Sequence, residues 1–146
     1  MSAFETEFMQ NIWTTLAYNS DNGIIQLKRH AQLPNQYGVY IIRAPFGLNR
    51  VRGNSNVVYI GQSGERGGKQ GIHDRIFNTR GVEELVREKI ESLFPNQNFT
   101  LQVCLTGQQN GQLARALEKQ LLSAYLNTHY ELPPANHQCP TDFKFD

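Results

Sequence analysis

The chain has 146 residues with a formal net charge of +1, a length that fits one domain with a core of its own. Its apolar runs are shorter than the roughly 18 residues that a membrane span needs, and residues 1–10 lack the layout of a secretion signal. We therefore expect a single cytoplasmic domain over residues 1–146, with no membrane partner. Cys104 and Cys139 are too few for a disulfide framework or a cysteine zinc site, and Cys104 lies in an apolar run that predicts burial.

Charge is distributed unevenly along the chain. Residues 43–80 carry seven Lys or Arg against two Asp or Glu, whereas residues 81–146 carry five against eight. A basic middle segment predicts a surface for a polyanion, although a solvated basic loop would have the same composition. The candidate phosphate-binding side chains are Arg43, Arg50, Arg52, Arg66, Lys69 and Arg80.

The first half of the chain predicts one helix and two strands. A helix is expected near the N-terminus, because five apolar residues recur there at spacings of three and four: Phe4, Phe8, Ile12, Trp13 and Leu16. Residues 19–23 are a turn signal, and residues 24–27 fit either a short strand or a connector. Residues 37–44 and 57–61 are rich in β-branched and aromatic residues and predict strands, separated by a long connection over residues 45–56.

The second half predicts helices around a third strand. Residues 62–71 predict a glycine-rich loop, residues 72–77 a helix, and residues 82–94, after a break at Gly81, an amphipathic helix lying on the sheet. Apolar residues alternate over residues 99–105, as in a strand. Residues 113–126 predict a last helix with Glu118 at its apolar margin, and its inward-facing stripe consists of Leu113, Leu117, Gln120, Leu121 and Ala124. An irregular tail follows.

Two short motifs and three later residues together resemble a known family. The sequence "GVY" at 38–40 lies near the beginning of the first predicted strand, and the sequence "YIG" at 59–61 ends the second. With an arginine on the next helix and a glutamate on a later one, this arrangement resembles the GIY-YIG nucleases. The resemblance covers about residues 37–136, with residues 1–35 as an N-terminal helical extension. It implies an α/β (α+β) fold in which helices flank a three-stranded antiparallel sheet.

The resemblance also implies an activity and a set of catalytic residues. The activity would be metal-dependent endonucleolytic hydrolysis of phosphodiester bonds in DNA, with Glu118 binding Mg²⁺ or Mn²⁺. The implied catalytic residues are Tyr40, Tyr59, Arg75, Glu118 and Asn136. These residue types fit the chemistry, because a carboxylate is a hard ligand for Mg²⁺, an arginine binds phosphate in bidentate fashion, and a phenol reaches water from a packed ring. The resemblance does not rank the two tyrosines as bases.

Several positions depart from the family pattern. Many relatives have His or Tyr where this chain has Thr79, and some have Lys where it has Gln62. His73, Lys69 and Gly61 are therefore auxiliary candidates.

Each candidate residue also has an ordinary structural interpretation. Glu118 and His73 would be solvated helix residues, Arg75 would pair with Asp74 or Glu84, and Asn136 would be a turn residue.

Two alternatives to a DNA endonuclease stay open. One is a nucleic-acid-binding module with the same fold and weak or no turnover. The other is a nuclease for RNA or for branched or damaged DNA, since base readout is not visible in the sequence. No separate DNA-reading module is evident, so specificity would come from the hairpin over residues 44–56, the N-terminal helix, a homodimer or a partner subunit.

Overall fold

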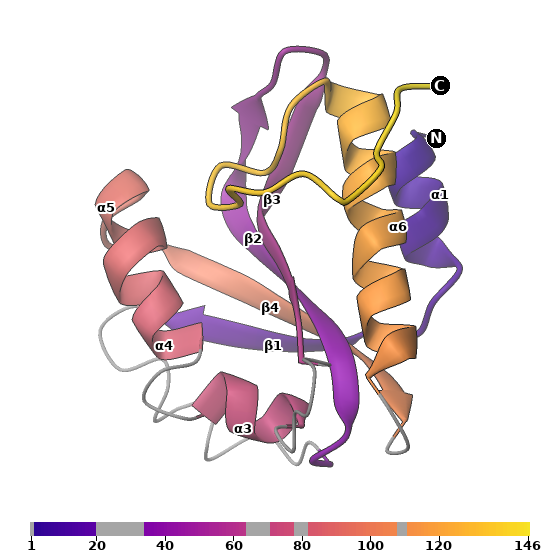
Figure 1. Cartoon of the computed structure of the whole chain (residues 1–146). Helices are drawn as coiled ribbons and strands as arrows, with labels where there is room; N and C mark the ends of the chain where they lie inside the picture. The colour runs from indigo at the N-terminus through magenta and orange to yellow at the C-terminus, as the bar shows by residue number, and fades with distance from the viewer. Residues whose placement is uncertain (1, 20–33, 64–70, 78–81, 108–110) are drawn as a thin grey trace.

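The computed structural model describes residues 2–19, 34–63, 71–77, 82–107 and 111–146. Its sheet has four antiparallel strands in the order β1-β4-β2-β3, with helices against both faces (Figure 1). The elements in chain order are α1 (Ala3–Met9), β1 (Thr14–Asn19), β2 (Tyr37–Asn49), β3 (Asn54–Gln62), α3 (Ile72–Phe77), α4 (Val82–Leu85), the π-helix η1 (Val86–Ile90), α5 (Glu91–Leu93), β4 (Asn98–Gly107) and α6 (Gln112–His129). The expected α+β class, an antiparallel sheet flanked by helices, is confirmed.

The fourth strand, β1, corrects the prediction that one short N-terminal helix carries the apolar residues from Phe4 to Leu16. Helix α1 ends at Met9, Ile12 is 90% exposed, and Leu16 lies in β1 opposite Leu101 of β4. The Trp13 indole donates to the Phe8 carbonyl oxygen at 2.8 Å, which fixes the turn between α1 and β1. The helical spacing of the apolar residues was misleading because hydrogen bonding to β4 determines the conformation of residues 14–19. This segment also contains the β-branched residues Thr14 and Thr15, which favour a strand.

The β2–β3 hairpin is longer than predicted. The expected connection over residues 45–56 is mostly strand, because β2 runs to Asn49, β3 begins at Asn54, and these two residues pair. Register shifts after Ile42 and after Arg43 bend this ribbon. Gly53 adopts a φ of 73° in the tight turn, a conformation that suits glycine. The end of the β2–β3 hairpin thus extends beyond the part of β2 that pairs with β4, which ends at Arg43.

Two apolar layers lie on the two faces of the sheet. Helices α3 and α4 with η1 cover one face, where Tyr40, Val58, Ile72, Ile90 and Leu101 belong to one buried cluster. Helices α1 and α6 cover the other face, and the second buried cluster includes Phe4, Val39, Ile41, Ile60, Leu121 and Tyr125. Cys104 is buried in this second layer, as predicted.

Helix α6 is rotated slightly from the predicted orientation. Leu117, Leu121 and Ala124 are buried as expected, but Leu113 is 64% exposed and Gln120 is also exposed. The buried face instead includes Ala114, Leu122 and Tyr125. Tyr125 is large and completely buried, so the buried face of α6 is centred closer to Tyr125 than the sequence pattern predicted.

The expected helix over residues 82–94 is interrupted by a π-helical turn. It consists of α4, η1 and α5, and Leu93, an apolar residue near the end of this amphipathic segment, is 49% exposed. The extra residue in the π turn shifts the side chains that follow, so a regular helical stripe does not hold to the end. The predicted elements over residues 24–27 and at Gly81, and most of the glycine-rich loop, lie outside the described residues.

The C-terminal tail crosses strand β3 after α6 and then returns alongside α6 (Figure 1). The Ala135 amide donates to the Val58 carbonyl oxygen at 3.0 Å. The tail thus covers part of the edge of β3. No helix in the described ranges has the length and apolar character that crossing a bilayer requires.

Candidate functional site

Two tyrosines from neighbouring strands meet over a glycine. Tyr40 on β2 lies opposite Gly61 on β3, and the centroids of the Tyr40 and Tyr59 rings are 5.8 Å apart. A Cβ atom at Gly61 would come within 2.6 Å of the Tyr40 hydroxyl oxygen and of a Tyr59 ring carbon. Gly61 therefore provides the space that both rings occupy.

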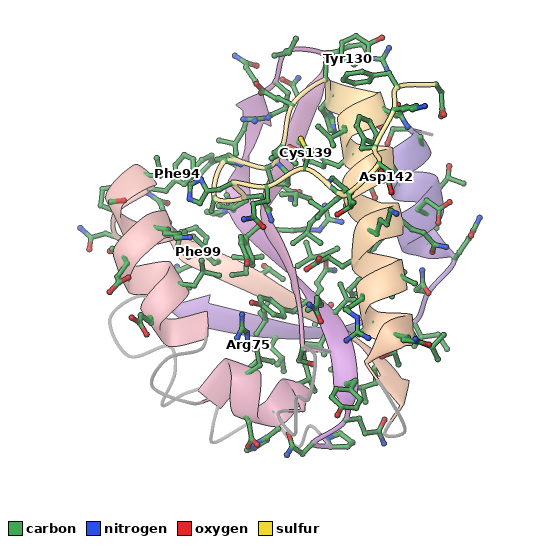
Figure 2. The ribbon with its side chains drawn as sticks, viewed as in Figure 1. Arg75, Phe94, Phe99, Tyr130, Cys139 and Asp142 are labelled. Atoms are coloured by element: carbon green, nitrogen blue, oxygen red, sulfur yellow. The ribbon has the colours of Figure 1, made fainter. Side chains whose placement is uncertain are left out.

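The environments of the two tyrosines differ. Tyr40 is buried, whereas Tyr59 is partly exposed. Burial raises the pKa of the Tyr40 phenol above its ordinary value and the neighbouring Tyr59 raises it further, while the Arg75 guanidinium, which hydrogen-bonds the phenol, opposes the rise. Figure 2 shows the Arg75 side chain extending from α3 toward the strands. Tyr40 is therefore a neutral hydroxyl at neutral pH, and Tyr59 is the tyrosine accessible to water.

Asn136 pairs with the backbone of β3 next to Tyr59. Its side-chain oxygen accepts from the Ile60 amide at 3.0 Å, and its side-chain nitrogen donates to the Ile60 carbonyl oxygen at 2.9 Å. The side-chain amide thus makes the two backbone hydrogen bonds that a neighbouring strand would make to Ile60. Asn136 positions the tail, and through Ile60 it fixes the backbone that carries Tyr59.

A hollow of about 320 Å³ lies at this edge of the sheet and is called the edge hollow below. Its described lining comes from β3, η1, α6 and the tail. The lining residues are Tyr59, Ile60, Lys89, Glu118, Leu122, Ala135, Asn136, His137 and Gln138. Three of the five predicted catalytic residues, Tyr59, Glu118 and Asn136, therefore line one cavity. The other two adjoin Tyr59, since Tyr40 packs its ring against that of Tyr59 and Arg75 hydrogen-bonds Tyr40.

The edge hollow offers oxygen donors that suit a hydrated divalent cation. Glu118 supplies a carboxylate and Tyr59 a hydroxyl, while the polar atoms of the Asn136 side chain are engaged with Ile60. Among the described residues there is no cluster of three or more His, Cys, Asp or Glu side chains. A cage built of protein ligands is thus absent from that part of the chain, but Mg²⁺ commonly binds through one or two carboxylates, waters and substrate phosphate. The donor set fits such an ion.

The auxiliary candidates lie elsewhere or outside the described residues. His73 on α3 is half-exposed, and its Nδ1 lies 3.8 Å from an Asp74 carboxylate oxygen. Gln62 ends β3 and pairs in register with Val39. Lys69 and Thr79 are outside the described residues.

Arg43 is engaged inside the fold. Its side chain is 13% exposed, donates to Gln102 at 2.7 Å and to Asn56 at 2.8 Å, and lies 3.5 Å from Glu5. The guanidinium also lies 4.7 Å from the centroid of the Phe8 ring. Burial lowers the pKa of Arg43, an effect that Glu5 opposes. These contacts join α1 to the sheet, so Arg43 has a structural role in place of the predicted phosphate contact.

Arg50 and Arg52 fasten the hairpin to the end of α6. Arg50 donates to the Leu132 carbonyl oxygen at 2.7 Å and pairs with Glu131 at 2.7 Å. Arg52 donates to the carbonyl oxygens of Asn127 and Thr128, among the last of the helix, and stacks 4.1 Å from the centroid of the Tyr130 ring. An arginine at this position satisfies carbonyls that lack partners within the helix. The other predicted phosphate contacts, Arg66, Lys69 and Arg80, lie outside the described residues.

Sequence reasoning missed the two basic residues that line the edge hollow, Lys89 and His137. Lys89 lies in η1 and has an exposed side chain, so nothing in the helical pattern distinguished it from an ordinary surface lysine. His137 directly follows Asn136, and this adjacency was the one available signal.

No protein-family model matches the chain, and neither a curated protein nor a solved structure matches it. The resemblance to the GIY-YIG nucleases therefore depends on the motifs and on the geometry described above.

Proposed function

We propose that the chain is a metal-dependent endonuclease of the GIY-YIG type that hydrolyses phosphodiester bonds in DNA. The observation that carries the proposal is the edge hollow, where Tyr59, Glu118 and Asn136 meet although they lie far apart in the sequence. In this proposal β2, β3 and β4 form the three-stranded core sheet of the family, and β1 is an additional edge strand.

Tyr59 is the residue proposed to contact the attacking water. It is partly exposed and lines the edge hollow, whereas Tyr40 is buried with its pKa raised by burial. Water attacks the phosphorus, the bond from phosphorus to the leaving ester oxygen breaks, and the products are a phosphate monoester and an alcohol. Tyr59 orients the water through a hydrogen bond, the proton of the water is lost to solvent as its oxygen bonds to phosphorus, and the leaving oxygen takes a proton from solvent. Tyr40 and Arg75 hold Tyr59 in place from behind.

Glu118 is the residue proposed to hold the divalent cation. It lines the edge hollow from α6, beside the position that the water would occupy in contact with Tyr59. A bound Mg²⁺ or Mn²⁺ would supply positive charge for the negative charge that develops on the phosphoryl oxygens.

The proposal predicts that Glu118→Ala abolishes metal-dependent cutting. Supercoiled plasmid would be incubated with wild type and E118A in Mg²⁺, in Mn²⁺ and with chelator, and the nicked and linear products would be quantified. We expect the wild type to nick only with metal and E118A to lose at least about 100-fold in rate, since a single electrostatic group at a reacting centre is often worth that much.

The matched control is Glu7→Ala, which removes a carboxylate from α1, outside the edge hollow. E7A should cut like the wild type. Equal cutting by E118A and wild type would contradict the proposal. The ratio of nicked to linear product would also indicate whether two active sites act together, as in a homodimer.

A binding module without turnover is the second candidate. It is favoured by the burial of Tyr40 and by the engagement of both polar atoms of Asn136 with Ile60, because neither residue then contacts substrate directly. DNA binding by wild type without cutting in either metal would select this candidate.

A further inference from the structure

The edge hollow lies where the two helical layers meet. Glu118 reaches it from α6, which packs on one face of the sheet, and Lys89 reaches it from η1, which packs on the other. Strand β3 lies between these helices at the edge of the sheet, and its Tyr59 and Ile60 line the cavity. A carboxylate and an ammonium group thus border one cavity from different layers.

Lys89 is held by an irregular helical turn. Val86 and Ile90, at the two ends of η1, are buried in the core, while Lys89 between them is exposed and lines the edge hollow. A π-helical turn contains an extra residue, which re-aims the side chains around it, and such turns are frequent at functional sites. The buried residues therefore fix the backbone from which the lysine extends.

The predicted phosphate-binding arginines of the described chain are used elsewhere. Arg43 is bonded to Gln102 and Asn56, Arg50 to Leu132 and Glu131, and Arg52 to the last carbonyls of α6. Among the described residues that line the edge hollow, Lys89 is the single Lys or Arg side chain. Among these lining side chains, Lys89 therefore supplies the permanent positive charge that can offset an anionic group entering beside Glu118.

We propose that Lys89 binds a non-bridging oxygen of a DNA phosphodiester in the edge hollow, opposite Glu118. The ligand class rests on the proposed function, but the contact does not require turnover. An ammonium group binds phosphate as a point charge on a flexible stem, which suits a residue that reaches across a cavity about 320 Å³ in volume.

The test compares Lys89→Met with Lys119→Met, which removes an exposed lysine of α6 that lies outside the edge hollow. Binding of a fluorescent DNA duplex would be measured by anisotropy in chelator, across a series of salt concentrations. K89M should bind roughly tenfold more weakly at low salt, the loss expected for one charged hydrogen bond, and the slope of log affinity against log salt should fall by about 0.9. K89R should restore most of the affinity, and K119M should match the wild type.

Equal affinity and slope for K89M and K119M would overturn the inference, even if the wild type cuts DNA. Absence of DNA binding by the wild type would overturn it as well. If the wild type binds but does not cut, and K89M alone loses affinity, the nuclease proposal fails and the Lys89 contact stands. Since Lys89 is exposed, circular dichroism melting should show that K89M keeps the wild-type fold.

Discussion

At the scale of single residues, Gly61 determines how closely the two tyrosines approach. Tyr40 is its cross-strand partner, and both tyrosine rings extend into the volume that a side chain at residue 61 would occupy. Tyr40 is buried against the core, so its ring has little freedom to withdraw. The glycine is thus required by packing, and the arrangement of Tyr59 at the edge hollow depends on it.

Gly61→Ala should therefore lower the free energy of unfolding by about 1–3 kcal/mol, the usual cost of forcing extra volume into a packed region. Urea unfolding followed by circular dichroism measures this. Gly47→Ala is the matched control, because nothing lies within 4 Å of a Cβ atom built at Gly47, and its stability should stay near that of the wild type. A G61A protein as stable as G47A would show that the rings move aside without cost.

At the scale of elements, the edge of β3 is completed by a piece of irregular chain. Asn136 makes two hydrogen bonds to Ile60, and Ala135 bonds to Val58. The other anchor of this region is Arg52, which joins the β2–β3 hairpin to the end of α6. The tail is held to the edge hollow by these contacts, so its position affects both the fold and the site.

Asn136→Ala should cost about 2 kcal/mol of stability, because it leaves the Ile60 amide and carbonyl groups without their partner. Hydrogen exchange at the Ile60 amide should accelerate markedly. Gln138→Ala, an exposed residue that also lines the hollow, is the control and should leave this exchange unchanged. Unchanged exchange in N136A would mean that the tail does not hold β3, and any loss of cutting would then be a direct effect of the missing amide.

The elements that could be predicted are those whose partners are close in sequence or whose pattern is strong. Residues 72–77, the strand containing Phe99 and Leu101, and the body of α6 follow directly from periodicity. Strand β1 could not be identified in this way, because its paired residues in β4 lie 79 to 89 positions away in the sequence. The roles of Arg50 and Arg52 were equally hidden, since composition does not show that α6 ends beside the hairpin.

The candidate site also contains residues that the sequence could predict and residues that depend on tertiary packing. Tyr59, Glu118 and Asn136 could be selected because the motifs that contain them resemble a family pattern. Lys89 could not, because it reaches the edge hollow only through the packing of Val86 and Ile90 and through the π-helical turn between them. Local sequence specifies which residues a helix buries, but the assembly of two layers decides which exposed residues face a common cavity.

At the scale of the whole molecule, the described residues include three groups, Tyr40, Tyr125 and Cys104, that burial keeps in protonated form. Burial raises the pKa of Tyr40, of Tyr125 and of the Cys104 thiol above their ordinary values. Tyr40 belongs to one apolar layer, whereas Tyr125 and Cys104 belong to the other. Burial in both layers therefore favours the protonated form of these side chains, so the free energy of unfolding should fall at alkaline pH.

The sign of this linkage follows from the proton counts. In the unfolded chain these groups release protons near their ordinary pKa values, about 8.5 for cysteine and about 10 for tyrosine, while the folded chain retains them. Their stabilising contribution is thus complete below those values and is lost as the pH rises. Each group contributes a slope of about 1.4 kcal/mol per pH unit between its unfolded and folded pKa values.

Urea unfolding at intervals from pH 8 to pH 11 should accordingly show stability falling from about pH 8.5, where the unfolded cysteine ionises, and falling more steeply above about pH 10, where the unfolded tyrosines ionise. Tyr40→Phe should reduce the slope of stability against pH by the contribution of one ionisable group. The variant also loses the hydrogen bond to Arg75, which lowers its stability at every pH. Phe99→Leu is the control, because it removes buried aromatic volume without removing a titratable group, so it should lower stability and keep the wild-type slope. If Y40F and wild type had the same slope, Tyr40 would have to ionise inside the fold, and it would then be a candidate base alongside Tyr59.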